Sequence, residues 1–272
     1  MGPRILFTDL DGTLLDDNKE ISQTNHQAIQ EALAQGHKIV VSTGRPLPSA
    51  KIQIERLGLN QEGCYAITYN GGLIYDTYHQ KVLYGRPIPR KFVKPLFQAA
   101  LQKQLHIHTY TDTHILSCRD TEELHVYAST TLIPYEIADE SLSRLTSDPY
   151  KLLVIDTCPD KLLDFQSSVL PSYQEELHSF FSTKELLEIV PVGVDKGAGV
   201  RWLCNYLHIP IEHSVAAGDA QNDISMLEAA HVGAVMCNAY PGIAEHGNYV
   251  TEHDNNHSGV AEIIRKFILQ QS

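Results

Sequence analysis

Residues 5–15 read ILFTDLDGTLL, a short apolar run that leads into two aspartates and a glycine. The run predicts a buried strand, and Asp9 and Asp11, two residues apart at its end, face the same way. In an α/β sheet, ligands bind at this carboxyl end of the strands. Two carboxylates this close repel each other unless a cation lies between them or one of them is protonated. The stretch therefore predicts a catalytic or metal site, with a solvated Asp-Gly turn as the alternative.

Apolar runs alternate with helical patterns in both end parts of the chain. Strands are predicted at residues 5–7, 38–41, 66–68, 214–217 and 232–236, and helices near residues 28–33, after Pro46, near 200–207 and near 224–230. Gly36 gives the first helix a C-terminal stop. Unbroken apolar strands that alternate with helices indicate a parallel sheet covered on both faces. The predicted fold class is α/β, with a doubly wound, Rossmann-like core.

The middle of the chain follows a different pattern. Helices are predicted near residues 91–104 and 161–169, and strands at 107–111, 115–117, 152–155, 178–182 and 187–190. This pattern predicts an α+β domain at residues 85–185, inserted into a discontinuous core domain of residues 1–84 and 186–272. His106 and His108 share one face of a predicted strand, and we expect them on the surface or at an interface.

Composition narrows the range of partners. The chain has 272 residues, 43% of them hydrophobic, and a formal net charge of −12 without a basic run. Such a charge disfavours nucleic acids and membrane surfaces as partners, whereas local donors and a cation can still bind a small phosphorylated metabolite. The sequence shows no signal peptide, no stretch approaching 18 apolar residues, and five cysteines without a CxxC pair. We therefore expect a cytoplasmic protein with reduced thiols.

Three further motifs fall at predicted strand ends. Residues 42–45 (STGR) place Thr43 and Gly44 where a hydroxyl and a backbone N–H can bind phosphate, although the motif is also an ordinary strand-to-helix turn. Residues 195–197 (DKG) place Lys196 at a helix start, where the alternative is a solvated lysine. Residues 218–223 (GDAQND) add Asp219 and Asp223, which can bind a metal or cap the following helix.

These four motifs, in this order at strand ends, resemble the haloacid dehalogenase superfamily. The insert, residues 70–72 (NGG) and residues 258–261 (SGVA) resemble its Cof-type sugar-phosphatase branch, in which an α/β cap is inserted into the core. The resemblance implies that Asp9 attacks phosphorus and binds Mg²⁺. Asp11 would protonate the leaving oxygen and then activate water, while its backbone carbonyl reaches the metal. Asp219 would complete the protein ligands, with Asp223 supporting it from outside the ligand set.

The same resemblance implies a set of groups that hold the phosphoryl oxygens: Thr43, Gly44, Lys196, Asn222 and the backbone N–H of Leu10. The predicted function is Mg²⁺-dependent hydrolysis of a small phosphomonoester, of the sugar phosphate, nucleotide, flavin mononucleotide or pyridoxal phosphate class, through a phospho-aspartyl intermediate. One alternative is a phosphotransferase or phosphomutase on the same core. Another is a protein that binds a phosphorylated metabolite without chemistry, although binding alone does not require a nucleophile beside an acid. We expect a monomer or a small homo-oligomer.

Overall fold

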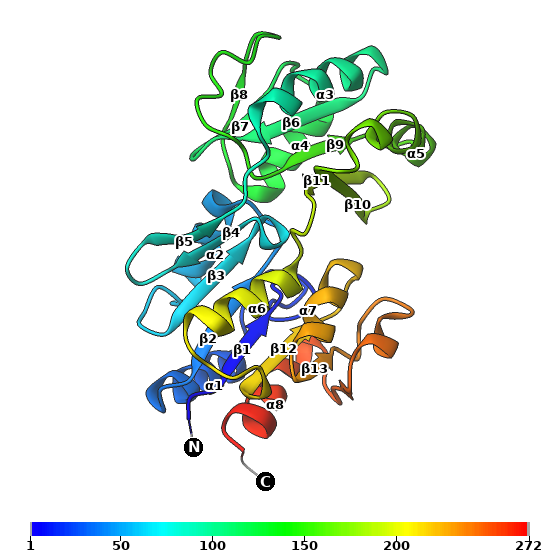
Figure 1. Ribbon diagram of the computed structural model, residues 1–272. Coiled ribbons are helices and arrows are strands. Elements are labelled where there is room, and N and C mark those ends of the chain that lie inside the picture. The colour runs from blue at the N-terminus through cyan, green and yellow to red at the C-terminus, as the bar shows by residue number, and fades with distance from the viewer. Residues whose placement is uncertain (1, 271–272) are drawn as a thin grey trace. The chain divides into compact units, whose positions relative to one another are not determined.

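A computed structural model describes residues 2–270, which divide into two compact units (Figure 1). The first unit comprises the residues up to Gly44, Ala50–Tyr84 and the chain from Asp195 onward. The second comprises Arg45–Ser49 and Gly85–Val194. Each unit is built around a sheet of its own. Within residues 2–270, no helix combines the length and the hydrophobicity needed to span a membrane.

The sheet of the first unit has eight strands among the described residues, in the order β14-β13-β12-β1-β2-β3-β4-β5. Their bounds are β1 Ile5–Thr8, β2 Lys38–Ser42, β3 Cys64–Thr68, β4 Leu73–Asp76, β5 Lys81–Gly85, β12 Ser214–Gly218, β13 Val232–Val235 and β14 Tyr249–Val250. The strands from β14 to β3 pair in parallel, and β4 runs antiparallel to β3. The predicted α/β class is confirmed, and the antiparallel edge is an addition that the sequence did not predict.

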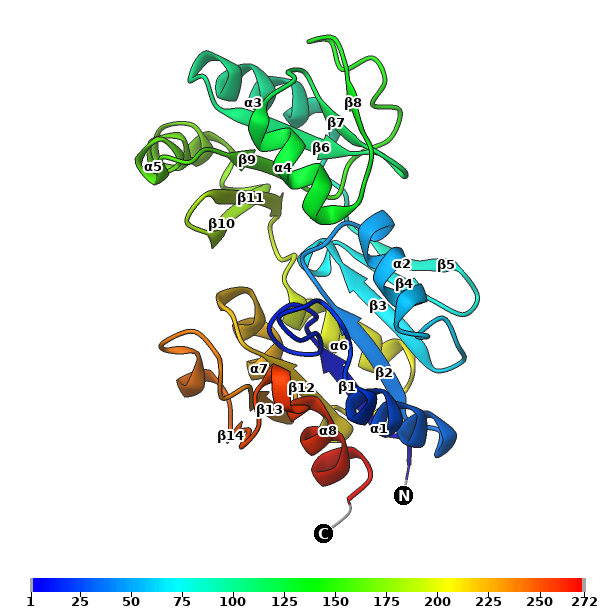
Figure 2. The same ribbon diagram turned by 180° about the vertical axis from the view of Figure 1, so that it is seen from behind.

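Helices cover both faces of this sheet. They are α1 Gln23–Ala34, α2 Leu47–Arg56, α6 Lys196–Tyr206, α7 Ile224–Ala229 and α8 Gly259–Ile263. Figures 1 and 2 show α6 and α7 on one face of the sheet and α1 and α8 on the other. Apolar side chains of α6 and α7 pack on the middle strands, in a core that includes Phe7, Val200 and Met226. The central strands are buried on both faces, which is why they read as unbroken apolar runs.

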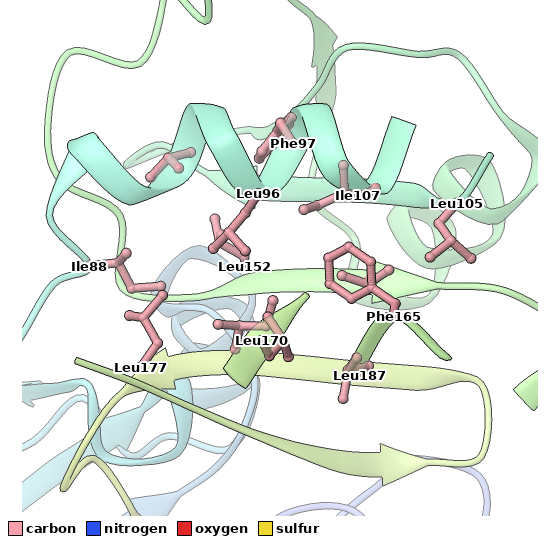
Figure 3. Close-up of a cluster of buried hydrophobic side chains, with 14 of the residues drawn as sticks. Ile88, Leu96, Phe97, Leu105, Ile107, Leu152, Phe165, Leu170, Leu177 and Leu187 are labelled. Carbon is pink, nitrogen blue, oxygen red and sulfur yellow. The ribbon is translucent and has the colours of Figure 1, made fainter. Parts of the chain in front are cut away.

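The second unit has a six-stranded sheet among the described residues, in the order β10-β11-β9-β6-β7-β8. Its elements are α3 Arg90–Gln102, β6 His106–Tyr110, β7 Ile115–Ser117, α4 Glu122–Thr131, β8 Tyr135–Ile137, β9 Leu152–Ile155, α5 Pro159–Ser168, β10 Leu177–Thr183 and β11 Leu186–Pro191. One face packs against α3 and α5 through an apolar cluster that includes Leu96, Phe97, Leu152, Phe165 and Leu187 (Figure 3). This unit therefore has a hydrophobic core of its own.

The domain boundary differs from the one expected at residue 186. Residues 186–194 belong to the second unit, because β11 is hydrogen-bonded to β9 and β10 in the six-stranded sheet. Arg45–Ser49 also belong to the second unit, although the sequence placed them in the core. There, the Ser49 hydroxyl donates to the backbone carbonyl of Thr131 at 2.7 Å.

The two histidines of β6 are interior residues rather than surface residues. They form a hydrogen-bonded chain from Thr121 through His106 and His108 to Tyr110 and Tyr127, with successive distances of 2.9, 2.9, 3.1 and 2.7 Å. His106 is 5% exposed and His108 is fully buried. Burial lowers the pKa of His106 to about 4 and that of His108 well below its usual value. Polar partners from α4 explain how two histidines are accommodated inside the unit.

Candidate active site

The site begins at the carboxyl end of β1, which lies between β2 and β12. Asp9 follows β1 directly, and its backbone N–H donates to the carbonyl of Ala217 at 3.0 Å. Asp9 is buried, whereas the Asp11 side chain is 38% exposed and forms an ion pair with Lys19 at 2.9 Å. Gly12 has a φ of 80°, a conformation that glycine adopts easily and that turns the chain away from the strand. The predicted pair therefore consists of one enclosed and one solvent-facing carboxylate.

Lys196 is the first residue of α6 and is fully buried beside Asp9. Its Nζ donates to Asp9 Oδ1 and to Asp223 Oδ1, each at 2.6 Å. Asp195 caps the helix by accepting from the Ala198 N–H at 2.7 Å, which fixes where the helix begins. Burial acts to lower the pKa of Lys196, but the two carboxylates outweigh it and hold this pKa above its usual value. Lys196 is therefore a charged group inside the site, not a solvated surface lysine.

Asp219 and Asp223 come from the loop between β12 and α7. Oδ2 of Asp223 accepts from the backbone N–H groups of Asp219 and Ala220, both at 3.0 Å. Oδ1 of Asp219 accepts from the Thr13 hydroxyl at 2.6 Å. Asp223 thus uses its two oxygens to hold Lys196 and the loop backbone, whereas Asp219 has one oxygen fixed by Thr13.

Carboxylate oxygens of Asp9, Asp219 and Asp223 lie within 4.8 Å of one another. Lys196 pairs with two of these buried groups, Asp9 and Asp223, so full ionisation of all three would leave excess negative charge. Burial raises the pKa of Asp9 to about 8 and that of Asp219 to about 6, and neighbouring carboxylates add to both shifts. Mg²⁺ prefers hard oxygen ligands, and a divalent cation would relieve this repulsion. The donor set therefore fits Mg²⁺.

The register of the parallel strands brings the remaining predicted residues to the same edge of the sheet. Thr8 in β1 pairs with Val41 in β2 and with Ala217 in β12. Thr43 and Gly44 therefore follow β2 at the level of the Asp9 loop. Thr43 is 2% exposed, and its backbone N–H continues the pairing with β3.

Asn222 reaches this edge from the loop after β12, the strand that pairs with β1 on the side opposite to β2. It lies in the short 3-10 helix η4 (Gln221–Asp223). Its Nδ2 donates to Asn70 Oδ1 at 3.1 Å. Asn70 belongs to the turn η1 (Tyr69–Gly71), which follows β3. Leu10, whose N–H was predicted to bind phosphate, is fully buried between the two motif aspartates.

The structure adds residues that the sequence did not single out. The Thr13 hydroxyl fixes Asp219, and its position directly after the Asp-Gly pair was an available signal. Asn238, which follows β13, donates from Nδ2 to the Gly12 carbonyl at 2.8 Å and supports the turn after the motif aspartates. No local sequence pattern marks Asn238, because this contact joins positions 226 residues apart.

Comparison with known proteins identifies the family. A sequence profile of haloacid dehalogenase-like hydrolases matches residues 6–264. The chain belongs to the haloacid dehalogenase-like hydrolases. This confirms the predicted family and explains why all four motifs stand at strand ends in the predicted order.

Individual relatives of this hydrolase extend over its full length. M6_Spy0533 of Streptococcus pyogenes, provisionally named a phosphatase, is 32% identical over 277 residues, covering 99% of this chain and 100% of the relative. The 5-amino-6-(5-phospho-D-ribitylamino)uracil phosphatase YcsE of Bacillus subtilis is 30% identical, covering 98% and 96%. The crystal structure of a haloacid dehalogenase-like hydrolase from Bacteroides thetaiotaomicron superposes with a TM-score of 0.90 at 28% identity, covering 97% and 99%. Similarity to named phosphatases supports an enzyme of the phosphoric monoester hydrolase class.

Proposed function

We propose that this hydrolase cleaves small phosphomonoesters with Mg²⁺ bound and with Asp9 as the nucleophile. The observation that carries the proposal is the buried Asp9 carboxylate, held through one oxygen by Lys196 at the end of the central strand. Holding Oδ1 in this way leaves Oδ2 to approach a phosphorus atom in line with the departing oxygen. Phosphoryl transfer depends mainly on such positioning and on positive charge around the equatorial oxygens.

The chemistry divides into two displacements. In the first, an Asp9 oxygen forms a bond to phosphorus while the ester P–O bond breaks, and Asp11 gives its proton to the departing alkoxide. In the second, Asp11 takes a proton from water as the water oxygen attacks phosphorus, and the bond to Asp9 breaks. The products are the alcohol and inorganic phosphate. The exposure of the Asp11 side chain supports this role, because a group that exchanges protons with substrate and water needs access to both.

The residues that would hold Mg²⁺ are Asp9, Asp219 and the backbone carbonyl of Asp11, with Asp223 outside the ligand set. The double use of Asp223 by Lys196 and the loop backbone supports this division. When bound, Mg²⁺ would offset the carboxylate charge and that of the phosphoryl oxygens. The oxygens would also be held by Thr43, Gly44, Lys196, Asn222 and the Leu10 N–H.

For the substrate, we propose a small phosphorylated metabolite of the sugar phosphate, nucleotide, flavin mononucleotide or pyridoxal phosphate class. The named activity of YcsE adds a ribitylaminouracil phosphate to the compounds worth testing. We further propose that the second unit acts as a cap that sets selectivity, since it has a sheet and a hydrophobic core of its own. Replacing residues 88–184 with a short linker should then leave Mg²⁺ binding intact and reduce discrimination among phosphate esters.

A phosphate-release screen over these compounds, with Mg²⁺ or with excess EDTA, tests the function. Wild-type protein should release phosphate only with the metal, and Asp9→Asn should lower turnover by about a thousandfold or more while the fold persists. Asp11→Asn should still bind inorganic phosphate but turn over slowly. Adding a sugar acceptor separates hydrolysis from transfer, because a phosphotransferase would form a sugar phosphate in place of free phosphate. An Asp9→Asn protein within tenfold of wild type would contradict the proposed nucleophile.

A further inference from the structure

The turn η1, after β3, has an uncommon backbone conformation. Three consecutive residues have positive φ angles: Tyr69 at 52°, Asn70 at 54° and Gly71 at 105°. Glycine adopts such angles freely and asparagine does so more readily than most residues, but tyrosine does so at an energetic cost. Such a conformation persists only where the surrounding contacts enforce it, and it concentrates at functional sites. The contacts of this turn therefore indicate what it holds in place.

Asn70 touches two of the elements that carry predicted phosphate ligands. It is 1% exposed, and its backbone N–H donates to the Thr43 carbonyl at 3.1 Å. Its side-chain amide lies close to Gly44, where an added Cβ would come within 2.9 Å of Oδ1 and 3.1 Å of Nδ2. Its Oδ1 accepts from Asn222 Nδ2 at 3.1 Å. Glycine is thus required at position 44 by the closeness of Asn70, since its own φ is not positive.

The next residue of the turn touches a third element. A Cβ on Gly71 would lie 2.2 Å from the backbone carbonyl oxygen of Asp195, the residue that caps α6 directly before Lys196. The turn therefore packs against the residues that follow β2, the start of α6 and the loop of Asn222. The side chain of Asn70 contacts two of these elements, at Gly44 and at Asn222.

We propose that Asn70 is a positioning residue that fixes the amide of Asn222 for phosphate binding. This inference rests on the proposed function, in which Asn222 donates to a phosphoryl oxygen. An acceptor at Asn70 Oδ1 selects the orientation in which Asn222 presents Nδ2, because the reverse orientation would bring two carbonyl oxygens together. Nδ2 carries two hydrogens, so one N–H binds Asn70 and the other remains for the anion. Asn70 thereby determines the direction in which Asn222 donates.

A double-mutant cycle tests this proposal with inorganic phosphate as the probe in the presence of Mg²⁺. Asn70→Gly removes the amide and keeps a residue that accepts a positive φ, so the turn should persist. We expect Asn70→Gly and Asn222→Ala each to weaken phosphate inhibition and kcat/KM by about tenfold, the effect of losing one oriented hydrogen bond to an anion. The double variant should be no weaker than Asn222→Ala alone.

Asn70→Ala separates positioning from stability. It removes the same amide but leaves a residue for which φ near 54° is unfavourable. The two Asn70 variants should therefore weaken phosphate binding equally, while Asn70→Ala unfolds at a lower urea concentration than Asn70→Gly. A phosphate affinity that follows the unfolding midpoint would overturn the positioning role.

The remaining outcomes distinguish this inference from the function on which it rests. If wild type hydrolyses phosphate esters and Asn222→Ala is impaired, but Asn70→Gly is normal, only the positioning role is refuted. The same holds if the losses from the two substitutions multiply in the double variant. If wild type is inactive on the whole panel, or if Asn222→Ala matches wild type, the phosphate-binding assignment fails and this inference fails with it.

Discussion

Replacing Lys196 with methionine is the most informative perturbation of the site, because it removes the cation and keeps an unbranched apolar side chain. Lys196 is fully buried and donates to Asp9 and Asp223 at 2.6 Å each. The variant would leave three buried carboxyl groups without a compensating protein charge. We expect loss of turnover together with a large loss of stability in the metal-free protein.

The magnitude follows from the geometry of the two ion pairs. At 2.6 Å and an effective dielectric constant of about 20, each attraction amounts to about 6 kcal/mol. The substitution also removes the unfavourable desolvation of the ammonium, which amounts to several kcal/mol. Breaking a buried ion pair by removing one partner has a net cost of about 3–5 kcal/mol. Since domains are stable by only about 5–15 kcal/mol, Lys196→Met should come close to unfolding the first unit.

Urea unfolding followed by tryptophan fluorescence measures this effect directly, because Trp202 is the single tryptophan of the chain and lies on the helix that Lys196 begins. Arg201→Met is the matched control, since Arg201 is on the same helix and forms an exposed ion pair with Asp195 at 3.9 Å. The control should change stability by no more than about 1 kcal/mol. Equal effects of the two substitutions in EDTA at pH 7.5 would refute the electrostatic account.

Acidification supplies a second test of the same prediction. A carboxylate whose folded pKa lies above its unfolded value binds protons more readily when folded, so its destabilising effect is present at neutral pH and fades on acidification toward the unfolded value. Asp219 supplies this dependence, because its pKa is about 6 with Lys196 present and removing the cation raises it further. Asp9, with a pKa of about 8, is largely protonated over this range in both proteins. The stability difference between Lys196→Met and wild type should therefore shrink from pH 7.5 to pH 5. A difference that stays constant over this range would mean that lost packing, not charge, dominates.

Three other substitutions, one of them with a matched control, probe separate features. Thr13→Val removes the hydroxyl that donates to Asp219 and should cost about 2 kcal/mol at pH 7.5, with a smaller loss at pH 5, where the carboxyl is protonated. Because the pKa of His106 is lowered to about 4, stability should fall by about 2 kcal/mol as the unfolded chain binds a proton between pH 6.5 and pH 4.5, and His106→Gln should flatten this dependence in circular dichroism. Gly71→Ala should destabilise by more than about 2 kcal/mol, since its Cβ would lie 2.2 Å from a carbonyl oxygen at a φ of 105°. Gly36→Ala is the matched control, because Gly36 also has a positive φ, of 83°, but an added Cβ there would meet no atom within 4 Å. It should lower the free energy of unfolding by about 1 kcal/mol in the same urea assay.

The parts of the fold that could be predicted are those in which local pattern and tertiary environment agree. β1, β2 and β12 are buried on both faces, so their apolar runs were visible in the sequence. The edge strand β5 was missed; it is largely solvent-exposed, and its short apolar run at residues 82–84 did not stand out from a loop. The domain boundary was misplaced at β11 because an apolar run does not reveal which of two sheets the strand joins. Strand pairing of this kind is decided by contacts distant in sequence.

The same distinction applies to the site. Asp9, Asp11, Lys196 and Asp219 stand in short motifs at strand ends, and a resemblance of motifs was enough to propose their roles. Asn70 was noticed only as part of residues 70–72, which resemble the Cof-type branch, because its role depends on the approach of Asn222, 152 residues further along the chain. The interior location of His106 was also hidden, since its partners, Thr121 and His108, satisfy its ring nitrogens through contacts that no periodicity shows.

The charge balance of the site explains why neutral donors matter in it. When all three are ionised, Asp9, Asp219 and Asp223 with one ammonium leave two negative charges, which a bound divalent cation would cancel. A phosphate dianion would then enter a site with little net charge, on a protein whose formal net charge is −12. Its affinity would depend on oriented N–H groups, such as those that follow β2 and the amide of Asn222, more than on general attraction. Oriented donors act only if their direction is fixed before the anion binds. The strained turn that holds Asn70 against Asn222 supplies that constraint.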